Sequence, residues 1–509
     1  MRVLLIKSGY MQSRVKAITQ PLGLMYIASY IRTYRSDEVK IFDIRFHKQY
    51  LQDIEHIILT YKPALVGISA LTLEAPNMFY IAHHVKAIDK NIPVIVGGPH
   101  ASSVPEEVIK NNDIDLAVIG EGEITFKEIL DAFEGERGLE TVDGICFRTD
   151  NKIIASSFKT SFLPEARTTA DEKFGVGLSP ITTDKATTFM KTNDRQYVQE
   201  LDTLPFPAWD LIEIMSYAKH GSMSDVGIRP YMVLFTSRGC PFLCTYCHNI
   251  FGKRFRARSV GNVINEMEKL INTYNINDFE VVDDISNLDK DRLKAICNGI
   301  INKDLKIRLS FPNGVRTDLF DEETIRLLKR AGTSEIAIAV ETASPRLQKL
   351  IKKNLNLEKV RKNIDIAAKA GIFLRGFFML GFPTETEQEM NATIDFACRS
   401  KLHVALFFVL NPYKGTEIVN QIQSAGKKLP EMNLEDFDYQ SMPFNSSAMD
   451  DNKFHKLYRR AYIKFYSNPV RIFRIIRDKP LYNDLFARFW GLISNYLPHP
   501  AGNKRSFKG

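Results

Sequence analysis

Three cysteines, Cys240, Cys244 and Cys247, lie within eight residues in the stretch TSRGCPFLCTYCHN. Thiolates at this spacing can hold three irons of a cubane iron–sulfur cluster. The fourth iron then has no protein ligand and can bind a small molecule, as the open position of a catalytic zinc ion does. Because Pro241 disfavours helical backbone at Cys240, we expect these cysteines in a loop that follows the apolar strand at 231–237.

Two other metal sites would use some of the same residues. His248 could complete a structural zinc site. Residues 244–248 also spell C-x-x-C-H, the attachment signature of c-type haem. Haem attachment of that kind needs export, and the N-terminal apolar stretch is too short for a signal-peptide core. The other cysteines, Cys146, Cys297 and Cys398, lie singly in apolar contexts and are expected to be core thiols.

The cysteine motif, with the aromatic Tyr246 before its last cysteine, resembles that of the radical S-adenosylmethionine (SAM) enzymes. Five later segments are similar to the second to sixth strands of their barrel. These segments are FEVVDD (279–284), NGVRTD from Asn313, IAIAVETA from Ile336, GFFMLGFPTE from Gly376 and LNPYKGTE from Leu410. The resemblance implies a [4Fe–4S] cluster on the three cysteines, reductive cleavage of SAM to a 5′-deoxyadenosyl radical, and a partial (β/α)6 barrel over 225–425.

The same resemblance implies which residues bind SAM. They are Asp283 and Asp284 beside the methionine amine, Arg316 at the carboxylate, Glu341 at the ribose, and the backbone of Gly381 and Phe382 at the adenine. A guanidinium presents a fork of donors that matches a planar carboxylate. The alternative for each acid or arginine is an ion pair that only stabilises the end of the barrel.

Residues 1–150 are expected to form a separate α/β domain. Apolar runs of strand length alternate with helical patterns, which predicts a doubly wound, flavodoxin-like parallel sheet. Ligands bind such sheets beyond the carboxyl ends of the strands. The candidate binding residues at those ends are Ser69, Gly97, Gly98, Gly120 and Gly122. Glycines there permit close approach of the backbone to a ligand.

Together with the barrel, the segments GISALT, VGGPHAS, VIGEGE and ELDTLPFPAWD resemble the cobalamin-binding-domain radical SAM family. The resemblance implies that cobalamin binds at those strand ends. Many cobalamin domains carry Asp-x-His-x-x-Gly, whose histidine binds cobalt from below. Here three residues separate Asp43 from His47 and no glycine follows. We therefore interpret His47 as a surface loop histidine and leave the lower cobalt ligand open.

The remaining segments are a polar linker and strap at 151–224 and a basic, helical region at 426–509. The latter interleaves Lys and Arg with Tyr458, Phe473, Phe489 and Trp490, and the net charge of the chain is +8. Such a helix can lie on an anionic membrane or pack its apolar side on the barrel. No segment resembles a nucleic-acid-binding module. A reducing, cytoplasmic setting, with peripheral membrane contact left open, suits this composition.

The expected function is methylation of an unactivated carbon in a small or lipid-like substrate, with cluster, SAM and cobalamin as cofactors. Reductive cleavage of SAM also implies an electron donor such as flavodoxin or ferredoxin. Two alternatives remain. One is an oxidative cyclase or rearrangement enzyme with the same cofactors but no methyl transfer, and the other is a sensor without turnover. An open iron favours an enzyme, because a sensor does not need one.

Overall fold

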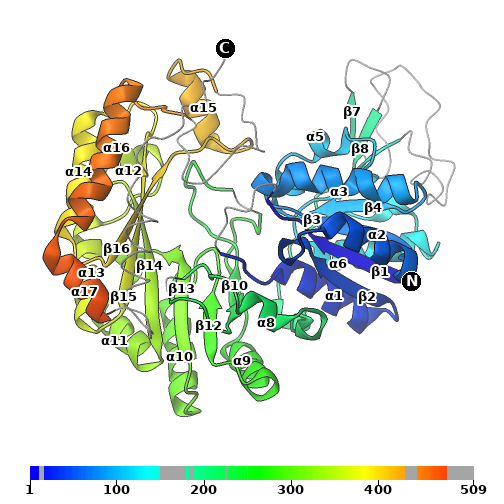
Figure 1. Ribbon diagram of the computed structural model, residues 1–509, viewed down its shortest axis with the longest axis horizontal. Helices are drawn as coiled ribbons and strands as arrows, with labels where there is room; N and C mark the ends of the chain where they lie inside the picture. Colours follow the sequence, from blue (N-terminus) through cyan, green and yellow to red (C-terminus); the bar gives the residue numbers. More distant parts are fainter. Residues whose placement is uncertain are drawn as a thin grey trace.

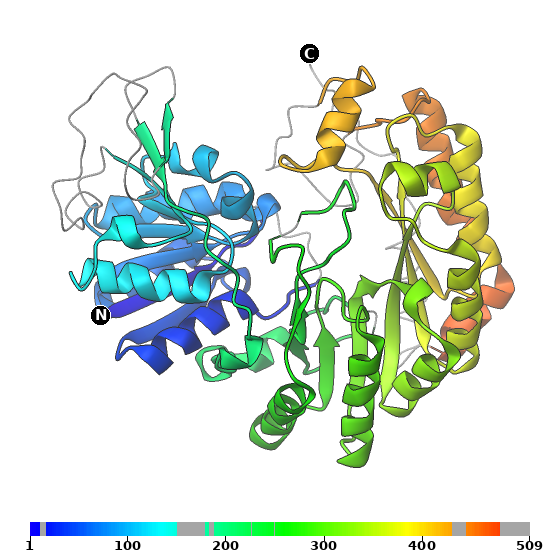
Figure 2. The same cartoon turned by 180° about the vertical axis from the view of Figure 1, so that it is seen from behind.

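The computed structural model describes residues 1–10, 17–149, 179–182, 188–224, 226–248, 250–429 and 444–478. These residues form an eight-stranded sheet, a six-stranded sheet and a two-stranded hairpin. Figure 1 places the N-terminal sheet, in blue and cyan, beside the curved second sheet, in green to orange. The reverse view shows the same arrangement (Figure 2). The chain therefore has two α/β units that lie side by side.

The N-terminal sheet has the strand order β2-β1-β3-β4-β5-β6-β8-β7. Its strands are β1 (Arg2–Lys7), β2 (Glu38–Asp43), β3 (Leu65–Ser69), β4 (Val94–Gly97), β5 (Leu116–Val118), β6 (Ile145–Arg148), β7 (Ser179–Thr182) and β8 (Thr188–Lys191). Strands β1 to β5 are parallel, and the other three join antiparallel. The order 2-1-3-4-5 is the flavodoxin-like one, so the expected doubly wound sheet is confirmed.

Helices cover both faces of this sheet, which explains its almost continuously apolar strands. In β1, Val3 and Leu5 belong to one core and Leu4 and Ile6 to the other. The helices of the first core are α1 (Leu22–Tyr34) and α6 (Gly122–Phe133), and those of the second are α2 (Tyr50–Tyr61), α3 (Ala75–Ile88) and α5 (Pro105–Ile109). The short α4 (Pro99–Ser103) directly follows β4.

The N-terminal sheet does not end at residue 150. Strand β8 pairs with β6, and β7 pairs with β8, so part of the expected linker belongs to this domain. Phe189 and Met190 of β8 are buried, one in each core of the domain. The polar composition of 151–187 concealed this extension, and most of those residues lie outside the described part of the chain.

The second sheet is parallel throughout and has the order β16-β15-β14-β13-β12-β9. Its strands are β9 (Met232–Leu234), β12 (Asp278–Val281), β13 (Arg308–Val315), β14 (Thr333–Glu341), β15 (Phe373–Leu380) and β16 (Val404–Val409). The helices that follow them are α9 (Val260–Tyr274), α10 (Lys290–Asn302), α11 (Glu322–Arg330), α12 (Pro345–Leu350), α13 (Leu357–Lys369), α14 (Glu387–Arg399) and α15 (Glu417–Ser424). This is the expected partial (β/α)6 barrel, with edges at β9 and β16.

The C-terminal region packs on the barrel through α16 (Asp451–Tyr466) and α17 (Pro469–Asp478). The hydroxyls of Tyr462 and Tyr466 bond the backbone of β16 at Phe407 and Ala405, which covers this edge strand. Phe473 remains 62% exposed, while Phe489 and Trp490 lie outside the described residues. Among the described helices, none has the length and apolarity needed to cross a bilayer.

Candidate active site

The three cysteines lie in the loop of a short hairpin between β10 (Ser237–Arg238) and β11 (Arg256–Ala257). The loop folds back on itself, because the backbone N–H of Cys240 donates to the carbonyl of Gly252 at 3.2 Å. Gly239 has a φ of +84°, and a Cβ there would lie 2.2 Å from the Arg254 carbonyl oxygen. Only glycine therefore permits the turn that leads into the cysteine motif.

The three thiols of the loop differ in exposure. Cys240 and Cys244 are half-buried and Cys247 is exposed. The surrounding protein and the two neighbouring thiols raise the pKa of Cys247 to about 11, so bound iron must displace a proton there. Within the described residues, no three His, Cys, Asp or Glu side chains converge on a single metal ion. A cubane cluster binds each thiolate to a different iron, so its ligands need not converge on one metal atom.

A cavity of about 470 Å³ joins the cysteine loop to the N-terminal domain. Cys244, Cys247 and His248 line it from the barrel side, and Ser103 at the end of α4 and Gly120 after β5 line it from the N-terminal domain. The Nδ1 atom of His248 lies 3.2 Å from the Ser103 hydroxyl, across the boundary between the domains. The candidate cluster site and the candidate cobalamin site therefore open into one space.

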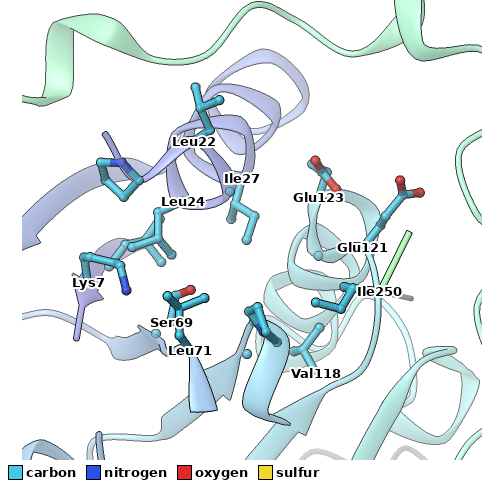
Figure 3. Close-up of a pocket in the computed structure, with 18 of the residues that line it drawn as sticks. Lys7, Leu22, Leu24, Ile27, Ser69, Leu71, Val118, Glu121, Glu123 and Ile250 are labelled. Carbon is cyan, nitrogen blue, oxygen red and sulfur yellow. The ribbon is translucent and has the colours of Figure 1, made fainter. Parts of the chain in front are cut away.

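A second cavity, of about 320 Å³, lies at the carboxyl ends of the parallel strands (Figure 3). All five predicted strand-end residues line it, namely Ser69, Gly97, Gly98, Gly120 and Gly122. Its other walls are mostly apolar and include Leu24, Ile27 and Val118. Gly98 has a φ of +89°, and a Cβ there would lie 2.9 Å from the Ser69 hydroxyl. Gly120 and Ile250 line both cavities, so the two are adjacent.

His47 lies away from these cavities. It follows a short 3-10 turn after β2, its side chain is 40% exposed, and its Nδ1 atom pairs with Asp53 at 2.9 Å. It is not among the residues that line either cavity. This agrees with its interpretation as a loop histidine on the surface.

The two predicted acids after β12 occupy different environments. Asp283 is buried, and its carboxylate accepts hydrogen bonds from the backbone N–H and hydroxyl of Thr236 and from the hydroxyl of Ser237, each at 2.6 Å. Asp284 is exposed, and one of its oxygens accepts the N–H of Gly239 at 3.0 Å. Desolvation between the walls of the barrel mouth raises its pKa. Asp283 thus organises the strand before the hairpin, and Asp284 binds the backbone at the start of the cysteine loop.

Arg316 is buried and largely engaged by the protein. Its Nε and Nη2 atoms bond the Asp318 carboxylate at 3.3 and 3.0 Å, and its Nη groups also donate to the carbonyls of Lys353 and Asn354. The guanidinium stacks on Phe242 in the cysteine loop, 3.9 Å from the ring centroid. These contacts use four of its five donors. Its observed role is to brace the cysteine loop.

Glu341 ends β14 in a left-handed conformation, with a φ of +66°, at an irregularity in the pairing with β15. Such strain in a residue other than glycine often marks a functional position. The buried Lys353 donates to Glu341 Oε1 and to the Tyr246 hydroxyl, each at 3.3 Å. Tyr246 also hydrogen-bonds Glu341, and burial raises its pKa well above the usual value. No motif or periodicity in the sequence marks Lys353 as a site residue.

Gly381 and Phe382 follow β15 as predicted, and a buried acid fixes their backbone. Glu385 Oε2 accepts both N–H groups, at 2.5 and 3.1 Å. Its Oε1 atom has no hydrogen-bond partner among the described residues, and burial raises its pKa to about 8. The carboxyl is therefore largely protonated at neutral pH. Glu385 lies within the segment that carried the resemblance, but its supporting role was not predicted.

Comparison with known proteins shows which family this chain belongs to. The profile of the "Radical SAM superfamily" matches residues 234–397, and that of the "B12 binding domain" matches 11–130. An uncharacterized methyltransferase of Pyrococcus horikoshii is 30% identical over 480 residues, which covers 94% of this chain and 92% of the relative. The chain belongs to the cobalamin-binding-domain radical SAM enzymes.

Other relatives of this radical SAM enzyme align over most of its length. The cytidylyl-2-hydroxyethylphosphonate methyltransferase of Streptomyces wedmorensis is 28% identical, covering 86% of this chain and 84% of the relative. The anaerobic magnesium-protoporphyrin IX monomethyl ester cyclase of Rubrivivax gelatinosus is 22% identical, covering 92% and 78%.

Two solved structures share the fold of this radical SAM enzyme. The cobalamin-dependent enzyme OxsB, with aqua-cobalamin and SAM bound, has a TM-score of 0.70 at 16% identity, covering 98% of this chain and 76% of that one. The methyltransferase TsrM from Kitasatospora setae, with cobalamin and a [4Fe–4S] cluster bound, has a TM-score of 0.65 at 18% identity, covering 84% and 79%.

The radical SAM enzyme uses a [4Fe–4S] cluster, SAM and cobalamin, the cofactors that characterise its family. Its residues fit these groups. Three cysteines leave one iron of a cubane open. Gly97, Gly98 and Gly120 line the strand-end cavity without side chains, which leaves their backbone open to close approach by a corrinoid.

Proposed function

We propose that this radical SAM enzyme transfers a methyl group from SAM to an unactivated carbon of a small or lipid-like substrate. The shared cavity of about 470 Å³ carries this proposal, because it brings the cysteine loop and the cobalamin-domain strand ends to one place. Methyl transfer to such a carbon needs both a hydrogen-abstracting radical and a methyl carrier within reach of the same atom. Two relatives that align over most of the chain are named methyltransferases.

The role of the protein in this reaction is placement and exclusion of water. When bound, the cluster and SAM supply a 5′-deoxyadenosyl radical, and cobalamin supplies a transferable methyl group. Ile119, Leu243 and Ile250 contribute apolar side chains to the shared cavity, and its other walls are largely polar. The reaction needs no general acid or base from the chain, so the lack of an obvious catalytic carboxylate pair is no objection.

For SAM itself, we propose that Asp284 binds the amine and Glu341 the ribose, while backbone at Gly381 and Phe382 borders the adenine. For the carboxylate we favour Lys353 over Arg316. Lys353 is a buried cation next to Tyr246 of the cysteine motif, with two of its three donors accounted for. Arg316 has most of its donors engaged. Asp283 supports the site from behind through its bonds to Thr236.

Reductive cleavage of SAM consumes one electron for each radical formed. We therefore propose a flavodoxin- or ferredoxin-type donor as the protein partner. Leu243, which lies between Cys240 and Cys244, is 57% exposed and would be accessible to such a donor. Lys253, which lines the same cavity as Leu243, and the next residue, Arg254, are also exposed. An acidic electron carrier would complement their charge.

A second candidate function is oxidative cyclisation with the same cofactors, because the cyclase of Rubrivivax gelatinosus aligns over 92% of the chain. The number of SAM-derived products formed per product molecule distinguishes methyl transfer from oxidative cyclisation. The reduced, cobalamin-loaded enzyme is incubated with methyl-labelled SAM and extracts of small molecules and lipids, and the labelled product is isolated. Methyl transfer predicts one 5′-deoxyadenosine and one S-adenosylhomocysteine per product. Formation of 5′-deoxyadenosine with product but without S-adenosylhomocysteine would support the cyclase and contradict methyl transfer.

A further inference from the structure

A buried ion-pair cluster fastens the base of the cysteine hairpin to the cobalamin-binding domain. Arg238 of β10 and Arg256 of β11 are cross-strand partners. Their Nη1 atoms lie 3.0 and 2.9 Å from the same oxygen, Glu121 Oε1. Arg238 also bonds Glu123 at 2.6 Å. All four side chains are between 2 and 5% exposed, so solvent hardly screens these charges.

The same acids belong to the wall of the cavity at the strand ends. Glu121 lies between Gly120 and Gly122, and Glu121, Glu123 and Arg238 all line this cavity. Figure 3 shows both carboxylates beside it, at the start of α6. A ligand that fills the cavity therefore touches the residues that hold the hairpin.

The cluster also resists partial opening. Glu121 Oε2 accepts the N–H of Val198 at 2.8 Å, and Arg256 donates to the Val198 carbonyl at 2.6 Å. Removing one partner from a buried ion pair leaves an uncompensated charge, which is strongly unfavourable. The carboxylate and the two arginines are therefore expected to move together. Arg238 is two residues before Cys240, so such movement reaches the first cluster ligand.

We propose that Glu121, with Arg238 and Arg256, acts as a positioning residue that makes cobalamin binding and cluster binding cooperative. Occupancy of the strand-end cavity fixes Glu121, which fixes the arginines and holds the cysteine loop in its cluster-binding shape. Coupling between two binding sites is reciprocal, so a bound cluster must strengthen cobalamin binding by the same factor. This inference concerns binding alone and goes beyond methyl transfer.

The test compares hydroxocobalamin binding to the full chain with and without its reconstituted cluster. Wild-type protein with the cluster should bind cobalamin about 5-fold or more tightly, by absorbance titration. Reciprocally, cobalamin should slow the loss of iron to a chelator. In Glu121→Gln the two cobalamin affinities should converge, while Glu121→Asp, which keeps the charge, should retain part of the difference.

The matched control is Glu266→Gln. Glu266, on α9, forms an equally buried pair with Arg258 at 2.5 Å, and neither residue lines the strand-end cavity. This variant should keep the wild-type coupling. Equal cobalamin affinities in the two wild-type forms would overturn the proposal without any variant, as would full coupling in folded Glu121→Gln. Neither result depends on whether the enzyme transfers methyl groups, so failure here is distinct from failure of the proposed function.

Discussion

The ammonium group of Lys353 lies 3.3 Å from the carboxylate of Glu341, and both side chains are about nine-tenths buried. A buried lysine is costly unless its charge is compensated and its donors are used. Glu341 and the Tyr246 hydroxyl account for two of its three donors. The third is suited to an anion in the barrel mouth, and the carboxylate of SAM is the anion that we propose for it.

Lys353→Met is expected to weaken SAM binding by about 10- to 100-fold, because hydrogen bonds to charged groups contribute about 1.5–3 kcal/mol. Bound iron should stay at the wild-type level, since Lys353 is no cluster ligand. Calorimetric titration of SAM and the change in the cluster's electron paramagnetic resonance signal on adding SAM would measure this. Lys349→Met, at an exposed position four residues earlier, is the control. Wild-type SAM affinity in Lys353→Met would reject the assignment.

Glu341→Ala tests the ribose contact separately. It should reduce SAM affinity by about 5- to 20-fold, as expected for loss of hydrogen bonds from a carboxylate, with iron content unchanged. It also leaves Lys353 without its ion-pair partner, so the double variant should lose less than the sum of the two single losses. Additive losses in that cycle would show that the two residues bind SAM independently.

Alanine at Cys240, Cys244 or Cys247 should remove most bound iron and all SAM cleavage, because thiolate is the ligating form. Cys297→Ala and Cys398→Ala should keep the cluster. Cys297 is buried in the barrel core, and Cys398 is half-buried on α14. Iron analysis and the absorbance of the reconstituted proteins would measure both sets. Full iron in the triple alanine variant would disprove the cluster site.

The meeting of the strand-end residues could be predicted from sequence, because it follows from the topology of a parallel sheet. Parallel strands put their carboxyl ends on one edge of the sheet, so Ser69, Gly97 and Gly120 had to meet once the strands were assigned. The three candidate cluster ligands could be grouped from sequence because they lie within eight residues of one another. Lys353 could not be predicted, since it follows α12 in a turn between two left-handed residues, Lys352 and Asn354. No periodicity tells where a side chain points in such a turn.

Contacts between the domains were beyond sequence reasoning. Glu121 and Arg256 are 135 positions apart, and each lies among other charges that could equally be solvated. Arg316 shows the converse problem. Its type and position at the strand end fitted a carboxylate ligand, but Asp318 and Phe242 occupy it. Several charged residues lie at the strand ends, and the sequence does not tell which of them faces a ligand. That depends on contacts that form only when the barrel is folded.

Gly98→Val is expected to abolish tight cobalamin binding, because its side chain would meet Ser69 and the Ala70 carbonyl at the strand end. The backbone strain at a φ of +89° adds a stability loss of about 1–3 kcal/mol. Gly135→Val is the matched control, since Gly135 also has positive φ but no atom within 4 Å of a built Cβ. It should lose stability and still bind cobalamin. Absorbance titration would compare them, and unaltered binding in Gly98→Val would place cobalamin elsewhere.

The buried carboxyl of Glu385 predicts a pH dependence of stability. Burial raises its pKa from 4.5 to about 8, so between these values the folded protein binds more protons than the unfolded chain. Stability must then fall as pH rises through this window, by up to about 1.4 kcal/mol per pH unit from this group. Glu385→Gln keeps an acceptor for the N–H groups of Gly381 and Phe382 but cannot ionise. The melting temperature of this variant, relative to wild type, should therefore rise from pH 5 to pH 8.

Glu389 provides a control of opposite sign, four residues along the same segment. Its hydrogen bond with Arg346 lowers its pKa to about 2, so its contribution is present above its usual pKa of 4.5 and is lost as pH falls towards 2. Glu389→Gln should therefore be less stable than wild type at pH 7, with the difference shrinking in acid. Melting curves of wild type and both variants across pH 2–8 would test the pair. A Glu385→Gln difference that does not change with pH would mean that Glu385 is ionised in the folded protein.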